Sequence, residues 1–190
     1  VRMSDEDLLP DFTESRVDGR LAYEGGLLKV HEDTVRLPDG KLSRREWVRH
    51  PGAVVMLALL DAGTLLLERQ YRYPLARHFL ELPAGKIDAG EAHLATAERE
   101  LREECGYVAR SWRHFATFHP CIGYSDERME FYLARDLASV ERSLDDGEFL
   151  EVVPMAQDEA LARIPAGEIT DLKTVAGLLW LQAERAGGRL

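Results

Sequence analysis

A cluster of carboxylates on one predicted helix constrains this chain more than any other feature. The stretch from residue 85 to residue 107 begins as a glycine-bounded loop and continues in strong helix formers. Glu100, Glu103 and Glu104 stand at i, i+3 and i+4, so a helix places all three close together. Carboxylates packed this closely repel one another unless a cation lies among them. A hard divalent cation such as Mg²⁺ prefers oxygen ligands of this kind.

The same pattern has a simpler interpretation, which is an acidic helix face exposed to solvent. Two details favour a ligand site. Arg99 adjoins the cluster and Glu91 lies about two helical turns before it, so an ion pair between them is expected to hold the loop against the helix. The glycine-bounded loop also allows a ligand to approach the backbone closely.

The stretch resembles the box of the Nudix hydrolases, G-x5-E-x7-R-E-U-x-E-E-x-G-U, in which U is a bulky apolar residue. The matching residues are Gly85, Glu91, Arg99, Glu100, Leu101, Glu103, Glu104 and Gly106. Tyr107 occupies the last position, where an aliphatic residue is more common. The resemblance implies hydrolysis of a nucleoside diphosphate linked to another group, with Mg²⁺ or Mn²⁺ as cofactor.

A second resemblance points to one branch of the family. The segments R-Q-Y-R at 69–72 and E-L-P-A-G-K at 81–86 are similar to those of the ADP-ribose pyrophosphatases. The resemblance implies that Arg72 contacts the substrate and that the carbonyl of Ala84 binds metal together with Glu100, Glu103 and Glu104. Arg69 and Glu81 are further substrate-binding candidates. From local sequence alone, the two arginines are the salt-bridged end of a strand.

The loop P-C-I-G-Y-S-D-E-R at 120–128 is either a solvated turn or a mobile carrier of a catalytic base. It resembles the loop P-S-P-G-F/Y-S/T-D/S-E of the same enzymes, which implies that Glu127 acts in catalysis alongside Arg99, Glu103 and Glu104. Ile122 stands where that loop has its second proline, a marker of ADP-ribose specificity.

Trp47 has two interpretations. By default it is a partly buried core aromatic. Related enzymes place an aromatic residue or an arginine from this region on the nucleobase, often from the partner subunit, and Trp47 is therefore a base-stacking candidate.

Composition limits the partners of the chain. The net charge of −10 argues against general nucleic-acid binding. The longest apolar run, at 53–60, is too short to span a membrane, and the acidic N-terminal stretch does not resemble a signal peptide. Two cysteines, Cys105 and Cys121, provide no disulfide framework. A cytoplasmic location is expected.

The order of elements predicts an α/β fold. Residues 1–14 are expected to be a frayed end, residues 15–50 an antiparallel β extension with a hairpin turn at 38–40, and residues 51–190 the hydrolase domain. The strand at 53–60 is expected to be central and to pair with 64–72. Helices are predicted from Glu91 to Cys105, at 158–164 and at 170–186. The predicted buried stripe of the first helix is Leu94, Ala97, Leu101 and Cys105, and on the last helix Leu172, Val175 and Leu179 are predicted to share one face.

The strands and helices are expected to form a mixed sheet with helices on both faces. The resemblance implies a Nudix α/β/α sandwich, and a homodimer with the β extension at the interface. It also implies that Mg²⁺-dependent cleavage of ADP-ribose gives AMP and ribose 5-phosphate. Another nucleoside diphosphate sugar, such as GDP-mannose, is the alternative substrate. A non-catalytic nucleotide-sugar sensor is the alternative of another class, and the intact box argues against it.

Overall fold

The computed structural model describes residues 10–190, and these fold into two compact units. The first unit contains the chain up to His50 together with Cys121–Glu127. The second contains Pro51–Pro120 and Arg128–Leu190. The predicted frayed end falls mainly on residues 1–9, which lie outside the described residues, and residues 10–14 have no regular secondary structure.

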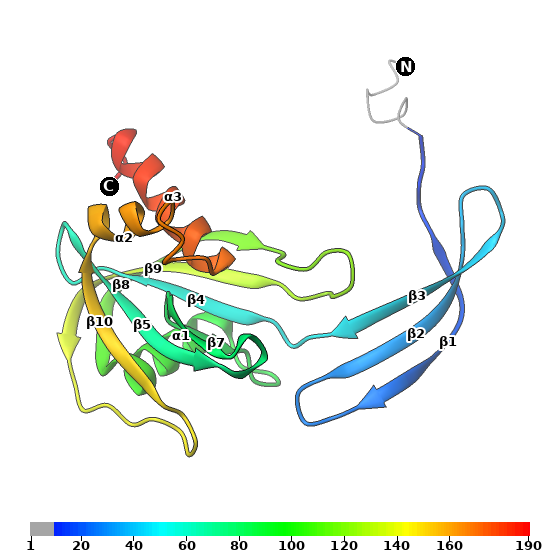
Figure 1. Ribbon diagram of the computed structural model, residues 1–190, viewed down its shortest axis with the longest axis horizontal. Coiled ribbons are helices and arrows are strands. Elements are labelled where there is room, and N and C mark those ends of the chain that lie inside the picture. The colour runs from blue at the N-terminus through cyan, green and yellow to red at the C-terminus, as the bar shows by residue number, and fades with distance from the viewer. Residues whose placement is uncertain (1–9) are drawn as a thin grey trace. The chain divides into compact units, whose positions relative to one another are not determined.

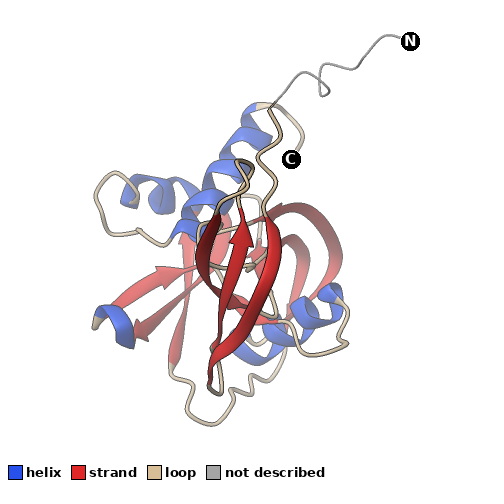
Figure 2. Cartoon of the chain, turned by 90° about the vertical axis from the view of Figure 1, so that its right-hand side faces the viewer, coloured by secondary structure: helices blue, strands red, loops and turns tan. Residues whose placement is uncertain are grey.

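The first unit is a three-stranded antiparallel sheet in the order β1-β2-β3 (Figures 1 and 2). Its strands are β1 (Ser15–Glu24), β2 (Lys29–Arg36) and β3 (Leu42–Arg49). The predicted hairpin turn joins β2 to β3, and Gly40 takes a positive φ of 85° in it, a conformation that favours glycine. The loop 121–127 lies along β3, where the Val48 amide donates to the carbonyl of Tyr124 at 2.8 Å.

The second unit contains two sheets. A mixed four-stranded sheet has the order β7-β4-β9-β8, and a three-stranded antiparallel sheet has the order β10-β5-β6. The strands of the first are β4 (Ala53–Ala58), β7 (Ala84–Lys86), β8 (Tyr107–Phe118) and β9 (Met129–Ser139), with β4 and β9 parallel. The strands of the second are β5 (Thr64–Arg72), β6 (Arg77–Glu81) and β10 (Leu150–Ala156).

The predicted pairing of 53–60 with 64–72 is wrong. β4 pairs with β7 and β9, and β5 pairs with β6 and β10, so only an isolated bridge from Leu59 to Leu65 links the two segments. The turn at Asp61 carries the chain into the other sheet. Every residue of β4 is buried, because strands lie on both of its edges and side chains cover both of its faces.

The helices cover both faces of the mixed sheet. They are α1 (His93–Glu100) with its continuation in a wider π-helical turn η3 (Leu101–Cys105), α2 (Gln157–Arg163) and α3 (Leu172–Ala186); a short 3₁₀ turn, η2, spans Tyr73–Leu75. On one face of β4, Met56 packs with Ala97 of α1. On the other, Leu57 packs with Leu178 of α3. This arrangement confirms the predicted α/β class. No helix within residues 10–190 has the length and apolar content that crossing a membrane requires.

Two predicted helix faces need correction. Leu94 is 39% exposed, whereas the rest of its predicted stripe is buried. On α3 the buried residues are Lys173, Thr174, Gly177, Leu178 and Leu181, and the predicted Leu172 and Leu179 are exposed. The packed face contains a glycine because a Cβ at Gly177 would lie 2.5 Å from Cδ1 of Leu82. Apolar periodicity missed this face because two of its members are polar and one has no side chain.

Candidate active site

Gly85 in β7 lies directly against Glu100 of α1. A Cβ at position 85 would lie 2.0 Å from Cδ of Glu100 and 2.1 Å from its Oε1, which is closer than atoms can approach. Only glycine therefore leaves room for this carboxylate beside the backbone of β7. That backbone includes Ala84, whose carbonyl is the predicted metal ligand.

Arg99 holds three box glutamates in place. Its guanidinium donates from Nε to Oε1 of Glu91 at 3.1 Å and from Nη2 to Oε2 of Glu91 at 3.0 Å, so the predicted ion pair is present. Its Nη1 donates to Glu100 at 2.9 Å and to Glu103 at 3.2 Å. The hydrogen bond from Arg99 lowers the pKa of Glu91 to about 2. Arg99 thus fixes the loop to the helix and orients two of the predicted metal ligands.

Glu104 differs from Glu100 and Glu103 because no basic side chain within residues 10–190 forms an ion pair with it. It is 6% exposed, and its Oε2 atom has no hydrogen-bond partner within the described chain. Burial raises the pKa of Glu104 to about 10, and the charges of Glu68, Glu100 and Glu148 act in the same direction. The residue lies on η3, and π-helical turns are frequent at functional sites.

The donor atoms fit a hard divalent cation. A buried carboxylate oxygen without a partner is costly, and a cation would supply the missing charge and contact. In residues 10–190 no three carboxylate, histidine or cysteine side chains are arranged to hold one ion together. Glu100 and Glu103 instead accept hydrogen bonds from Arg99.

Sequence reasoning missed Glu68, a fully buried carboxylate on β5. Its Oε1 accepts a hydrogen bond from the Cys105 thiol at 3.3 Å, and its Oε2 has no partner among the described residues. Burial raises the pKa of Glu68 to about 7. Strand alternation was the available signal, because it places position 68 on the same face as the buried Leu66. A charge after three leucines instead suggests the exposed end of a strand.

Arg72 and Glu81, both predicted to bind substrate, contact each other. Arg72 donates from Nε and Nη2 to the two carboxylate oxygens of Glu81 at 2.7 and 2.6 Å. Lys173 of α3 donates to the same carboxylate and, at 2.9 Å, to Asp171. Burial alone would raise the pKa of Glu81, but these two cations outweigh it and lower the pKa. The sequence did not reveal the role of Lys173, nor that of Asp171 as the N-cap of α3.

A cavity of about 320 Å³ opens beside Glu104. Glu148 and two aromatic side chains, Tyr71 and Phe149, share its lining, and Phe149 is 86% exposed. Sequence reasoning missed the segment 147–150, because nothing local to it indicates that it faces the box helix. The cavity combines aromatic surface with a few polar groups, as small-molecule sites generally do.

The remaining predicted residues form contacts of their own. Arg69 faces Glu151 across the sheet at 3.8 Å. Trp47 and Glu127 belong to the first unit, whereas the box carboxylates belong to the second. Trp47 donates a hydrogen bond from Nε1 to Oδ2 of Asp33 at 2.9 Å. Its ring stacks on that of His31, with 4.5 Å between the ring centroids. The Glu127 carboxylate lies 3.8 Å from Nδ1 of His50.

Comparisons with known proteins agree with this geometry. A family model described as the NUDIX domain matches residues 48–175. The chain is 39% identical over 166 residues to the ADP-ribose pyrophosphatase of Bacillus subtilis (strain 168), covering 86% of this chain and 90% of that protein. It is 37% identical over 177 residues to the methanol dehydrogenase activator of Bacillus methanolicus, covering 92% of this chain and 96% of that protein. A crystal structure of an ADP compounds hydrolase superposes with a TM-score of 0.84 over 96% of this chain and 100% of that one; at 20% identity, this likeness establishes the fold.

Proposed function

This chain belongs to the Nudix hydrolase family, and on that basis we propose that it hydrolyses the diphosphate bond of ADP-ribose to give AMP and ribose 5-phosphate. The observation that carries the proposal is the buried, unpartnered Oε2 of Glu104 at a cavity with aromatic walls. The similarity to an ADP-ribose pyrophosphatase over most of both chains supports the substrate.

Nudix hydrolases generally use divalent cations. We propose Mg²⁺, with Mn²⁺ as a substitute, held by the Ala84 carbonyl and by Glu100, Glu103 and Glu104. When bound, the cation neutralises the diphosphate and lowers the pKa of a coordinated water. Arg99 keeps Glu100 and Glu103 beside the loop. Glu104 contributes a charge that its buried surroundings otherwise disfavour.

Two carboxylates are candidates for accepting the proton of the attacking water. Glu127 is the first, from the resemblance of its loop. Glu148 is the second, because it lines the same cavity as Glu104. The side chain of Arg72 is 43% exposed, and its carboxylate partner Glu81 also accepts a hydrogen bond from Lys173. This arrangement supports a role of Arg72 in binding the diphosphate or the distal sugar. Arg69 is a further candidate for that contact.

We also propose that Trp47 stacks on the nucleobase and that the chain forms a homodimer through the first unit. The hydrogen bond to Asp33 fixes the orientation of the Trp47 ring. The sheet of this unit exposes Val17, Leu21 and Tyr23, an apolar surface that a partner subunit would cover. Light scattering of the purified protein tests the dimer, and a mass of one chain would exclude it.

The test of the activity is a panel of nucleoside diphosphate compounds with Mg²⁺, in which an added phosphatase releases phosphate from the products. ADP-ribose should be the preferred substrate, and Glu104→Gln should lower its turnover roughly a thousandfold. Glu98→Gln is the matched control, because Glu98 is an exposed carboxylate on the same helix. Preference for GDP-mannose would favour the alternative substrate, and tight binding without turnover would favour a sensor.

A further inference from the structure

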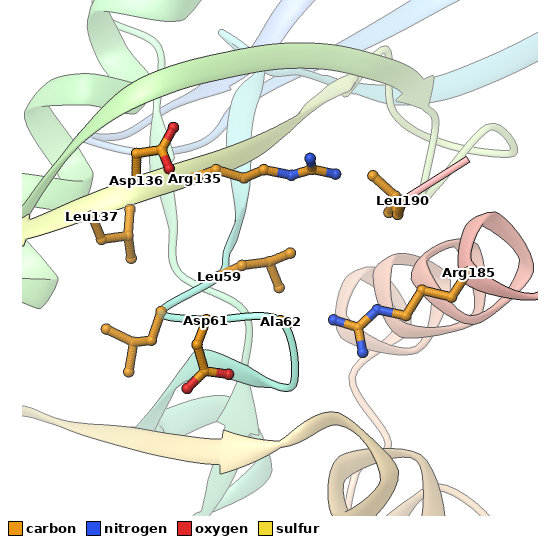
Figure 3. Close-up of a pocket in the computed structure, with 9 residues that line it drawn as sticks. Leu59, Asp61, Ala62, Arg135, Asp136, Leu137, Arg185 and Leu190 are labelled. Carbon is orange, nitrogen blue, oxygen red and sulfur yellow. The ribbon is translucent and has the colours of Figure 1, made fainter. Parts of the chain in front are cut away.

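A larger cavity, of about 560 Å³, lies in the second unit at the other end of β4 from the box glycine (Figure 3). The loop 59–62, the strand segment 135–137, Arg185 of α3 and Leu190 form its lining. Gly85 pairs with Val54, and Leu59 comes five residues later, roughly 16 Å along an extended strand. None of the candidate active-site residues lines this cavity. It is therefore a separate feature of the molecule.

Two arginines without ion-pair partners reach into the cavity. In the described part of the chain, neither Arg135 nor Arg185 forms an ion pair, and the buried Nε of Arg135 has no hydrogen-bond partner. Figure 3 shows their guanidinium groups entering from different elements, β9 and α3, with Leu59 between them. A guanidinium that is partly buried without an acceptor is costly, so the pair favours an anion between β9 and α3.

Among the described residues, the acidic members of the lining, Asp61 and Asp136, form no ion pair with either arginine. Oδ1 of Asp61 accepts hydrogen bonds from the backbone of Gly63 at 2.7 Å and of Thr64 at 2.8 Å, which hold the carboxylate in its own turn. These backbone bonds lower the pKa of Asp61, and the charge of Arg185 adds to the effect. The carboxylate of Asp136 lies at the opposite end of the cavity from both guanidinium groups (Figure 3).

The backbone of β9 is irregular where it lines the cavity. Arg135, Asp136 and Leu137 all line it, although successive side chains of a regular strand point to opposite faces. Asp136 adopts a left-handed conformation with φ of 55°, which interrupts the alternation. Leu59 provides apolar surface between the two arginines, and Leu137 adds apolar surface at the end of the cavity where Asp136 lies (Figure 3). The volume lies in the range of about 300–1,000 Å³ that is typical of small-molecule sites.

We propose that this cavity binds a small organic anion, whose oxyanion is held by Arg135 and Arg185 and whose apolar body rests on Leu59 and Leu137. The planar guanidinium group binds carboxylates and phosphate esters alike. The arginines therefore indicate that the ligand is negatively charged but not which of these two groups carries the charge. The site does not depend on the proposed hydrolysis, because it shares no residue with the box.

The test is titration calorimetry of the whole protein without divalent cations, using probes of similar shape. Phenyl phosphate and benzoate are the anionic probes, and benzamidine is the cationic counterpart. The anions should bind, and Arg185→Gln should weaken them by roughly tenfold to a hundredfold. Arg135→Lys keeps the charge of the strand residue and should also weaken binding, because a lysine cannot form the fork. Arg36→Gln removes one positive charge from an exposed position of the first unit and should change nothing.

The comparison of phenyl phosphate with benzoate identifies the anionic group of the ligand. Tighter binding of phenyl phosphate indicates a phosphate ester, and tighter binding of benzoate indicates a carboxylate. Binding by the Glu104→Gln variant should equal that of the wild type, which separates this cavity from the box. Three results would overturn the proposal: no saturable binding of either anion up to about 10 mM, binding that neither arginine variant weakens, or benzamidine binding as tightly as the anions.

Discussion

The Cys105 thiol donates a hydrogen bond to the Glu68 carboxylate at 3.3 Å and thereby ties β5 to the helical turn that carries Glu104. Cys105 immediately follows Glu104 in the chain, and an oxygen of each glutamate is buried without a partner in the described structure. Burial raises the pKa of both carboxyls, and the charge of Glu68 raises that of Glu104 further. The chemistry of the box therefore depends on a strand residue outside the box.

Replacing Glu68 with glutamine should stabilise the protein at high pH. The pKa of Glu68 is about 7 in the folded chain against 4.5 for an unperturbed glutamate, so folding favours its protonated form. That preference costs nothing below pH 4.5, grows as the pH rises and reaches roughly 3 kcal/mol above pH 7. Urea unfolding in EDTA should show a larger gain for Glu68→Gln at pH 8 than at pH 4.5. An equal effect at both pH values would contradict the assigned pKa.

Binding of a divalent cation should release a proton. With the pKa of Glu104 at about 10, this carboxyl is protonated at pH 8 and must ionise to hold a cation. Metal affinity should therefore rise with pH up to about 10. Calorimetric titration with Mn²⁺ in two buffers of different ionisation enthalpy should give about one proton released per chain. Glu104→Gln should lose that release, and identical heats in both buffers for the wild type would refute the prediction.

Gly85→Ala should disable the enzyme more than it unfolds it. The new methyl group would lie 2.0 Å from Glu100 Cδ, so the carboxylate must move away from the loop. A displacement of about 1 Å at such a site costs roughly a hundredfold in turnover. Overpacking should cost about 1–3 kcal/mol in unfolding free energy. Gly26→Ala is the control, because a Cβ there meets nothing within 4 Å. Unchanged turnover in Gly85→Ala would show that the position of Glu100 is unimportant.

Lys173→Met should destabilise the fold by roughly 3–5 kcal/mol, because it removes one of the two cations that hold the buried Glu81. Chemical unfolding at pH 7 measures the loss. The double variant with Glu81→Gln removes the unpaired charge as well and should recover part of the stability. If the double variant is no more stable than Lys173→Met, the lysine contributes through packing and not through charge.

The proton acceptor can be assigned by comparing two variants. Glu127→Gln should lower kcat by roughly a hundredfold to ten-thousandfold if it accepts the proton of the attacking water. Glu148→Gln should then have the smaller effect and act mainly on the pKa of Glu104, which the charge of Glu148 helps to raise. The reverse order of the two kcat values would transfer the role to Glu148. Circular dichroism of both variants checks that the fold is unchanged.

The local part of the site could be predicted from the sequence because its contacts join residues that are close together in the chain. A helix returns to the same face every three or four residues, so the spacing of these residues predicts that their side chains are in contact. The residues are Glu91, Arg99, Glu100 and Glu103. The α/β class followed from the order of strand and helix patterns. The pairing of β4 and the buried face of α3 did not follow, because both depend on which distant element packs alongside.

The sequence by itself determined the family, the α/β class and the ion pair between Arg99 and Glu91 that holds the box loop to the helix. Each of these depends on the types of residues and on their local spacing in the chain. Only the tertiary structure decided which charges share the buried space around that box. Lys173 reaches Glu81 from 92 residues away, and Cys105 reaches Glu68 from 37 residues away. The physical reason is that burial sets the pKa and the pairing of a carboxylate, and burial depends on the packing of all the elements together.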